Sequence, residues 1–304
     1  MDQLSPPYPL IRDRLARGNV IPFLGAGASL VSPRTADPDA HEQARQNEPE
    51  LLTGGQLAQT LAARMVLPEG TSLALAEVAQ YFELIMGRPP LHEELHDIFA
   101  KDYPLPPLHR YLADLETMLL IVTTNYDDLM ERAFRDRGRP FDLVIHTTDR
   151  NLGDRLLWWR HGAADPEEVV SNKLAIDLGA VSVIYKMHGA VDRRDPGRDQ
   201  YVITEDDYIE FLTRDARQRA IPAVFAEPFQ KRHFLFLGYS LSDWNLRVVL
   251  NRAVKQLGKE RKNKSWAIRM RVSPLEKRLW QERGVETYDM SIDQFVEQLK
   301  SARA

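Results

Sequence analysis

Four short segments of the chain place small, polar and ionisable residues directly after apolar runs. In chain order they are Gly25-Ala26-Gly27-Ala28-Ser29, Thr124-Asn125-Tyr126-Asp127, His188-Gly189 and Gly238-Tyr239-Ser240. Glycine lets a backbone approach a phosphate closely and present N–H donors to it. An imidazole can accept a proton near neutral pH, and a positioned base accelerates reactions by roughly 10²–10⁴-fold. The four segments together predict a single site that combines phosphate binding with proton transfer.

Asn125 and His188 are the side chains to which we assign the chemistry, and each also has a structural interpretation. Asn125 lies close to where a helix is expected to begin, and Asn and Asp are both favoured as helix N-caps. Asp127 or Asp128 can cap that helix, which leaves Asn125 free to point into the site. A lone histidine is usually a hydrogen-bonded structural residue. The position of His188 opposite Asn125 and the glycine segment favours the catalytic interpretation.

The glycine segment by itself admits two interpretations. It reads Gly-x-Gly-x-Ser rather than the full Gly-x-Gly-x-x-Gly of dehydrogenases, and no acidic residue on a second strand follows about 20 residues later. A structural turn is therefore an alternative to a phosphate-binding loop. The chain has no Gly-Lys-Ser or Gly-Lys-Thr sequence, which argues against a P-loop ATPase.

The elements that position these segments follow from an alternation of apolar runs and helical patterns. Strands are predicted at residues 20–24, 118–122, 142–146, 181–187, 201–204, 233–237, 265–270 and 285–288. Helices are predicted near residues 9–17, 56–65, 73–86, 90–100, 108–114, 129–134, 204–212, 242–257, 273–283 and 291–301, with a mobile loop at 32–55. This alternation predicts an α/β fold, a Rossmann-like parallel sheet with helices on both faces. Ligands of such sheets bind beyond the carboxyl ends of the strands, where all four segments lie.

We predict one domain over residues 1–304, with a helical insertion at about residues 56–115 and a variable insert at about residues 147–180. Residues 156–159 of the second insert read Leu-Leu-Trp-Trp. They have three interpretations: a helix, a surface for a partner, or ordinary core packing.

Composition narrows the class of protein. Hydrophobic residues make up 43% of the 304 residues and charged residues 28%, as in an ordinary globular protein. The net charge of −4 gives no general attraction to nucleic acid. No apolar stretch approaches the roughly 20 residues that span a membrane, and residues 1–7 do not resemble a signal peptide. We therefore expect a cytoplasmic protein that binds neither membrane nor nucleic acid.

Metal chemistry is not expected. The chain contains no cysteine, which excludes disulfides, thiolate catalysis and cysteine-bound zinc. His92 and His96 are one helical turn apart but lack the third ligand that zinc needs. The expected arrangement for this pair is a solvated helix face.

The ordered set of four segments resembles the sirtuin superfamily. The corresponding sirtuin patterns are Gly-Ala-Gly-x-Ser, Gln-Asn-Ile-Asp, His-Gly and Gly-Thr-Ser. The chain is most similar to the sirtuin-like NAD-hydrolysing domains of bacterial antiphage defence systems, over about residues 18–300. The resemblance implies a sirtuin-like fold with NAD as the substrate and without a metal.

The resemblance also implies a role for each segment. The residues implied to hold the NAD phosphates and the adjacent ribose are Gly25, Ala26, Gly27 and Ser29, with Thr124 also in the cofactor site. Asn125 is implied to contact the nicotinamide ribose and to position the attacking water, and His188 to contact the ribose hydroxyls and act as base. Asp127 is implied to bind the nicotinamide carboxamide. The residues implied to line the adenosine side are Gly238, Ser240 and Asp243.

Departures from the sirtuin pattern bear on the activity. Deacylases of the family carry a module with four zinc-binding cysteines, which is absent here. The resemblance also implies that inserted residues 130–180, between Asn125 and His188, occupy the region that would frame an acyl-lysine tunnel. Tyr126 and Tyr239 replace Ile and Thr, which changes the shape of the pockets. Without an acyl-lysine the nucleophile is water, so the resemblance favours an NAD glycohydrolase that produces nicotinamide and ADP-ribose. An NAD-dependent protein deacylase and a catalytically silent NAD- or ADP-ribose-binding scaffold are the alternatives.

Uncontrolled NAD hydrolysis would kill the host cell, so the activity is expected to be latent. The resemblance implies a homo-oligomer and a separately encoded partner, such as a hexameric ATPase translocase or a nucleic-acid-guided sensor. Assembly or binding of that partner would then switch the enzyme on.

Overall fold

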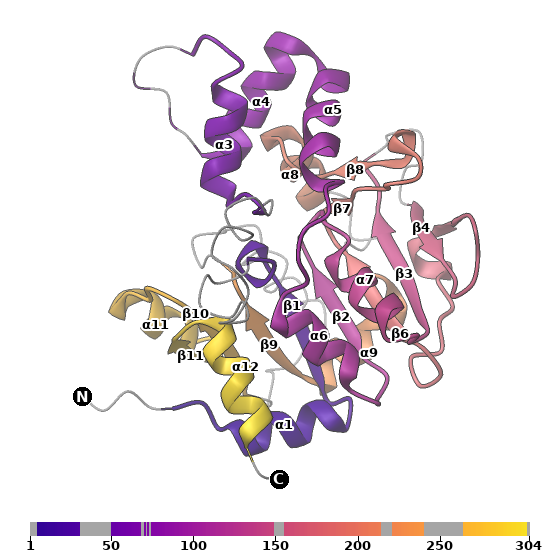
Figure 1. The fold of residues 1–304 in the computed structure, drawn as a ribbon, viewed down its shortest axis with the longest axis vertical. Coiled ribbons are helices and arrows are strands. Elements are labelled where there is room, and N and C mark those ends of the chain that lie inside the picture. Colours follow the sequence, from indigo (N-terminus) through magenta and orange to yellow (C-terminus); the bar gives the residue numbers. More distant parts are fainter. Residues whose placement is uncertain are drawn as a thin grey trace, which may run out of the picture.

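The computed structural model describes residues 5–30, 50–67, 70, 72, 74–148, 155–213, 221–239 and 264–302. At its centre lies a nine-stranded sheet (Figure 1). The strands follow one another across this sheet in the order β11 (Val285–Asp289), β10 (Ser265–Arg269), β9 (His233–Leu237), β1 (Val20–Leu24), β2 (Leu120–Thr123), β6 (Ser182–Lys186), β3 (Phe141–His146), β4 (Arg155–Trp159) and β5 (Glu167–Val170).

The seven strands from β11 to β3 are mutually parallel, whereas β4 and β5 extend the sheet in antiparallel fashion. The inner strands β1, β2 and β6 are buried along their whole length. Parallel strands that are covered on both faces need such continuous apolar runs. The predicted α/β fold with a Rossmann-like sheet is therefore confirmed.

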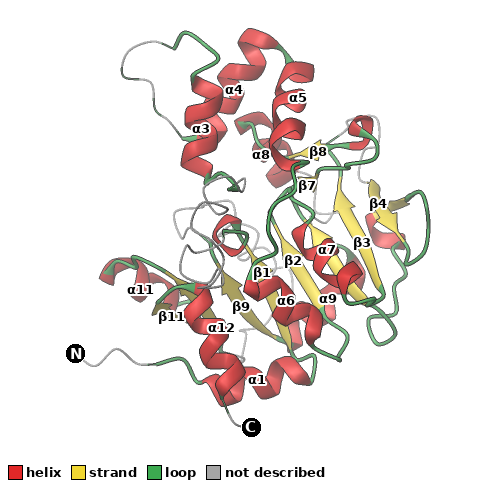
Figure 2. Ribbon diagram, in the orientation of Figure 1, coloured by secondary structure: helices red, strands yellow, loops and turns green. Residues whose placement is uncertain are grey.

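Helices cover both faces of the sheet (Figure 2). One face carries α1 (Tyr8–Ala16), α6 (Pro107–Asp114), α7 (Leu129–Asp136) and α12 (Ile292–Ser301). The other face carries α9 (Ala223–Lys231) and α11 (Pro274–Gln281), and α8 (Glu205–Thr213) adds Phe211 to the same apolar cluster. Serine capping boxes open α11 at Ser273 and α12 at Ser291, which satisfies backbone N–H groups at both helix starts.

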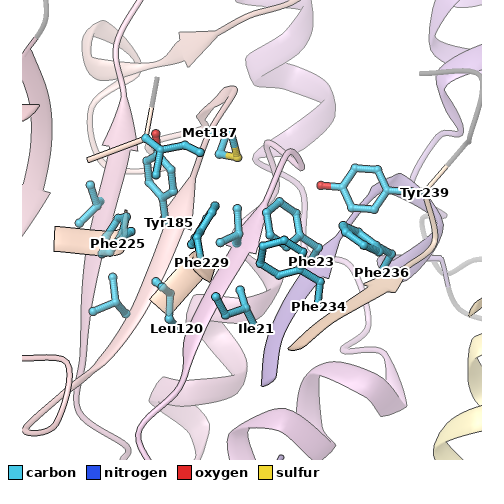
Figure 3. Close-up of a cluster of buried hydrophobic side chains, with 14 of the residues drawn as sticks. Ile21, Phe23, Leu120, Tyr185, Met187, Phe225, Phe229, Phe234, Phe236 and Tyr239 are labelled. Atoms are coloured by element: carbon cyan, nitrogen blue, oxygen red, sulfur yellow. The ribbon is translucent and has the colours of Figure 1, made fainter. Parts of the chain in front are cut away.

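An aromatic cluster fills the space between β1, β9 and α9 (Figure 3). The Phe23 ring lies 5.2 Å from that of Phe234 and 5.8 Å from that of Phe229, both at edge-on angles that aromatic rings favour. Tyr185 of β6 packs 5.3 Å from Phe225 of α9. These rings belong to one buried cluster that packs α9 against β1, β6 and β9.

A group of three helices lies above those strand ends (Figure 1). It consists of α3 (Gly54–Ala62), α4 (Leu75–Met86) and α5 (Arg88–Phe99), all within the region predicted as a helical insertion. The three helices share an apolar cluster with Tyr126 and with Tyr201, which belongs to a small two-stranded sheet of β7 (Gly189–Ala190) and β8 (Gln200–Tyr201). The helical group therefore packs directly against the segment that follows β2.

Most predicted elements are confirmed within about two residues, and several are corrected. Residues 156–159 are not a helix but lie in β4, where the Trp158 indole donates to the Asp142 carboxylate at 2.8 Å in the protein interior, as core packing requires. The predicted strand at 201–204 is confined to β8, outside the main sheet. Helix α9 was not predicted. The mobile loop at 32–55 and the helix at 242–257 lie largely or wholly outside the described residues.

The histidine pair of α5 does not form a solvated face, contrary to the prediction. His92 accepts a hydrogen bond from Arg88 Nε at 2.9 Å and packs edge-on against Tyr201. His96 Nδ1 lies 2.8 Å from the carboxylate of Asp199. Both imidazoles therefore connect α5 to the small sheet.

None of the described helices is both long enough and apolar enough to cross a membrane.

Candidate functional site

Strand register brings the four sequence segments to one edge of the sheet. Leu237, Leu24, Thr123 and Lys186 are paired across β9, β1, β2 and β6, and so form one row at the ends of four neighbouring strands. The residues that come next after this row are Gly238, Gly25, Thr124 and Met187, followed by Tyr239, Ala26, Asn125 and His188. Neighbouring strands lie roughly 4.8 Å apart. The described segments that carry the predicted site residues therefore begin side by side at one edge of the sheet.

The glycines of β1 and β9 meet backbone to backbone. Gly27 N–H donates to the Gly238 carbonyl at 3.0 Å, and Gly25 N–H donates to Leu237 O at 2.9 Å. Gly238 has a φ of +72°, and a Cβ there would lie 2.2 Å from Ala28 N. A Cβ on Gly25 would likewise lie 2.9 Å from Gly238 O, and one on Gly27 3.0 Å from Gly238 Cα. Close packing therefore favours glycine in the Gly25–Gly27 segment, so the structural-turn interpretation holds beside any role in ligand binding.

Asn125 is oriented by the glycine loop. Its side-chain Nδ2 donates to Gly25 O at 3.0 Å and to Ser29 Oγ at 2.9 Å, and its backbone N–H donates to Thr123 Oγ1 at 3.0 Å. Both N–H groups of the amide are used in this way. Within the described part of the chain, the amide oxygen Oδ1 accepts no hydrogen bond, so it can accept one from a water molecule or a hydroxyl group.

Thr124 connects the ends of β2 and β9. Its hydroxyl donates to the Tyr239 hydroxyl at 3.3 Å, and its backbone N–H donates to Leu24 O at 3.2 Å. Tyr239 is 5% exposed and packs on the ring of Phe23 (Figure 3). The threonine at this position therefore has a structural partner in the site.

Asp128 occupies the N-cap position of α7, and Asp127, the residue before it, supplies the side-chain hydrogen bond at the start of the helix. Asp127 Oδ1 accepts from Leu129 N–H at 3.1 Å, whereas Asp128 makes no side-chain capping bond. The other carboxylate oxygen of Asp127, Oδ2, is buried and has no partner among the described residues. A buried acceptor without a donor is costly, so this oxygen is suited to the N–H group of a ligand amide.

His188 lies two residues after Lys186, at the same level as Asn125, which lies two residues after Thr123. The imidazole is 4% exposed and packs edge-on against Tyr208 and Phe211 of α8, with ring centroids 5.4 and 5.5 Å away. Gly189, with a φ of +86°, turns the chain directly after it into the small sheet. Helix α8 thus forms the wall against which the imidazole rests.

Tyr126 is the buried member of the segment after β2. Its hydroxyl donates to Val202 O at 2.6 Å, and burial raises its pKa well above the usual value. The ring packs edge-on against Phe99 and Tyr201. The phenol is therefore a neutral structural anchor rather than an acid or base.

A buried polar cluster that the sequence analysis missed lies beneath the Asn125 segment. Lys186 Nζ is 2.9 Å from Glu131 Oε1, and both side chains are at most 3% exposed. His109 is buried nearby. Burial lowers the pKa of His109 to about 4, with the positive charge of Lys186 lowering it further and Glu131 opposing the shift. The available signal was a lysine inside the otherwise apolar run Val183-Ile184-Tyr185-Lys186-Met187.

A second hollow lies to one side of the site. A cavity of about 700 Å³ opens between α7, β3, β4 and the 191–198 loop, and arginines line much of it. Four of these arginines are already paired: Arg193 with Asp102 at 2.6 Å, Arg160 with Glu167 at 2.8 Å, Arg198 with Asp165 at 2.9 Å and Arg135 with Asp128 at 3.9 Å. The cavity is not at the Asn125 and His188 strand ends, and we assign it no ligand.

Of the predicted site residues, the structure gathers Gly25, Ala26, Gly27, Ser29, Thr124, Asn125, Asp127, His188 and Gly238 at one edge of the sheet. Ser240 and Asp243 lie outside the described residues. Among the residues that are described, no group of three or more His, Asp or Glu side chains is placed to hold a metal ion.

Fold and site together define an α/β protein with a Rossmann-like parallel sheet, in which the segments after four adjacent parallel strands meet at one edge of the sheet. Residues 119–288, more than half of the chain, match the model of the SIR2-like domain family, and the chain belongs to that family.

Curated relatives support the same family. The chain is 26% identical over 199 residues to the Defense-associated sirtuin 2 of Bacillus subtilis, covering 66% of this chain and 17% of that protein. It is 26% identical to the NAD(+) hydrolase ThsA of Enterococcus faecium, covering 79% of this chain and 41% of the relative. It is 29% identical to the NAD(+) hydrolase ThsA of Acinetobacter baumannii (strain 532279), covering 65% of this chain and 35% of the relative. The chain thus spans less than half the length of each of these relatives.

Proposed function

We propose that this chain hydrolyses the bond between nicotinamide and ribose in NAD, releasing nicotinamide and ADP-ribose. The single observation that carries the proposal is the row of paired residues that ends β9, β1, β2 and β6. That row places an asparagine amide and an imidazole on neighbouring strand ends, beside a glycine loop. The names of the ThsA relatives support the choice of reaction.

The proposed roles follow from the contacts. Asn125 holds the attacking water through its Oδ1, because both of its N–H groups are already used by Gly25 and Ser29. Water adds to the ribose carbon, nicotinamide leaves with the bonding electron pair, and His188 takes the proton of the water. The positive charge that develops on the sugar is stabilised in a site from which bulk water is excluded.

The remaining site residues are proposed to bind NAD. Gly25, Ala26, Gly27, Ser29 and Thr124 are the proposed contacts for its phosphates and the adjacent ribose. The unpartnered Oδ2 of Asp127 fits the N–H group of the nicotinamide carboxamide. Gly238, Ser240 and Asp243 are proposed for the adenosine side, and no metal takes part.

We further propose that the enzyme acts as a cytoplasmic effector of antiphage defence, kept latent until a partner or self-assembly activates it. A relative named as a defence-associated sirtuin supports this role. The partner would be separately encoded, such as a hexameric ATPase translocase or a nucleic-acid-guided sensor, and the active form would be a homo-oligomer. Neither membrane nor nucleic acid would bind the chain directly.

The function is tested by measuring nicotinamide release from NAD over a wide range of protein concentration. Asn125→Ala and His188→Ala are each expected to reduce the rate by about 100-fold or more, because positioned groups of this kind contribute roughly that factor. His161→Ala, at an exposed histidine, is the matched control and should leave the rate unchanged.

Two other outcomes would replace the proposal. Nicotinamide release that requires an acylated peptide would indicate an NAD-dependent deacylase. ADP-ribose binding without turnover, even with the partner present, would indicate a scaffold.

A further inference from the structure

The ammonium group of Lys186 is buried beneath the segment that carries Asn125. The side chain is 1% exposed, at the end of β6, and its Nζ lies 2.9 Å from Glu131 Oε1 of α7. It also donates to the carbonyl of Asp127 and lies 3.5 Å from the carbonyl of Tyr126. An ammonium has three N–H donors, and these three acceptors match their number.

Two of those acceptors belong to the backbone that follows Asn125. This segment has left the β2 ladder, so its carbonyls need partners from elsewhere. The Tyr126 carbonyl receives a second hydrogen bond, from Val191 N–H at 2.9 Å. Lys186 and Val191 lie on either side of His188 in the chain, so the segment that carries the imidazole is held to the segment that carries the amide at two points.

Within the buried cluster of Lys186, Glu131 and His109, the charges of Lys186 and Glu131 offset each other. Glu131 Oε2 has no hydrogen-bond partner among the described residues, nor does His109 Nδ1. Glu131 neutralises the ammonium from one side, while the carbonyls of the Asn125 segment solvate it from the other. Buried ion pairs are weak contributors to net stability, since apolar pairs of similar size often replace them without loss. The contacts to the carbonyls satisfy two backbone acceptors and at the same time fix the position of the segment that carries Asn125.

We propose that Lys186 is a positioning residue that sets the distance and angle between the Asn125 amide and the His188 imidazole. Glu131 holds the Lys186 ammonium in place through the 2.9 Å ion pair. This inference rests on the proposed NAD hydrolysis, because the geometry it maintains is that of the reacting groups.

The discriminating variant is the double substitution Lys186→Met with Glu131→Leu. Replacing both charges removes the unpaired-charge penalty that either single change would create, so we expect a much smaller loss of melting temperature than in Lys186→Met alone. The carbonyls of Tyr126 and Asp127 lose their donor. We therefore expect kcat for NAD hydrolysis to fall about 10- to 100-fold while KM changes little, since a displacement of about 1 Å can cost that much.

Hydrogen exchange supplies a readout that does not depend on turnover. Amides of residues 122–130 should exchange faster in the double variant than in the wild type, and those of β9 and β10 should not change. Lys264→Met is the matched control, because Lys264 is a solvent-exposed lysine paired with Glu286 at the far side of the sheet. It should change neither kcat nor exchange in residues 122–130.

A second variant keeps the test valid if the double variant does not fold. Glu131→Gln leaves Lys186 with all its backbone acceptors and an amide oxygen in place of the carboxylate. It should lower stability, as Lys186→Met does, but lower kcat far less. Equal losses of kcat in Glu131→Gln and Lys186→Met would show that the pair is only structural and would overturn the inference.

The outcomes for the two proposals are separable. A double variant with wild-type kcat and wild-type exchange sinks the positioning role alone, while NAD hydrolysis by the wild type still stands. A wild type without turnover at any protein concentration, with and without the activating partner, sinks the proposed function. In that case, unchanged hydrogen exchange in the double variant would also show that Lys186 does not hold residues 122–130 in place. Faster exchange would show that it does.

Discussion

Asn125 and Asp127 are each held by hydrogen bonds that leave one side-chain oxygen available as an acceptor. The Asn125 amide spends both N–H groups on the glycine loop and keeps its oxygen as an acceptor. Asp127 spends one carboxylate oxygen on the start of α7 and keeps the other without a partner. The site thus presents two oxygen acceptors, on Asn125 and Asp127, whose positions are set by hydrogen bonds to neighbouring groups.

Gly238 offers a residue-scale test of how tightly the strand ends are packed. Gly238→Ala forces a Cβ to within 2.2 Å of Ala28 N at a φ of +72°, so both backbone strain and a clash oppose it. We expect a loss of about 3 kcal/mol or more in the free energy of unfolding, measured in urea.

The matched control is Gly138→Ala. Gly138 has a φ of +60°, but no atom lies within 4 Å of the position of its Cβ. It should cost only the strain of a left-handed conformation, roughly 1–2 kcal/mol. Equal losses for the two variants would contradict the close packing of Gly27 against Gly238.

Among the elements, α8 connects the helical group to the imidazole. Its Asp207 pairs with Arg88 of α5 at 2.9 Å, and its Tyr208 and Phe211 pack on His188. Arg88 also donates to Glu83 at 2.9 Å and to the Tyr201 carbonyl at 2.8 Å. One guanidinium thus joins two helices of the upper group to α8 and to the small sheet.

Arg88→Met tests this joint. The substitution leaves the Asp207 carboxylate and the Tyr201 carbonyl without their charged donor, and we expect a loss of about 2–3 kcal/mol in the free energy of unfolding. Hydrogen exchange should speed up in residues 205–213 before it does in the central strands. Arg110→Met, at an exposed position of α6, is the control and should be close to neutral. Exchange in α8 as slow as in the wild type would argue against the joint.

Strand β4, in the antiparallel part of the sheet, shows that a local sequence pattern can fit more than one type of structure. Leu156, Leu157 and Trp158 read as an apolar run that suits a helix, a strand or an interface. The choice was made by β3, which pairs with β4, and by Asp142, which accepts from the Trp158 indole. The structure of residues 156–159 therefore depends on pairing with β3, and the periodicity of these residues alone does not predict that pairing.

For the whole molecule, both faces of the sheet are covered and the carboxyl ends face the helical group (Figure 1). A ligand bound there contacts loops from four strands and the wall formed by α8. Binding should therefore stabilise the entire fold rather than one loop.

ADP-ribose tests this expectation without turnover. At a ligand concentration of about 100 times Kd, mass action adds about 2.7 kcal/mol, which corresponds to a rise of roughly 5 °C in the melting temperature. ATP at the same concentration controls for unspecific effects of phosphate. A rise of the same size with ATP, or none with ADP-ribose, would count against a site selective for the proposed product.

The sequence by itself determined the local elements and the candidate residues. Apolar runs of strand length predicted the parallel strands, and the four segments after them predicted the site, because both depend on the burial pattern and chemistry of short stretches. The assignment of Asp127 to the start of α7 was one of two alternatives that the sequence offered.

Only the tertiary structure decided which strands lie side by side and in what register. That register aligned Thr123 with Lys186 and so brought Asn125 and His188 to the same level. It also buried Lys186 against Glu131, a pair that neither segment predicts alone. The physical reason is that pairing between distant strands depends on packing and hydrogen bonding summed over the whole sheet, whereas sequence periodicity reports only which side of each element is buried.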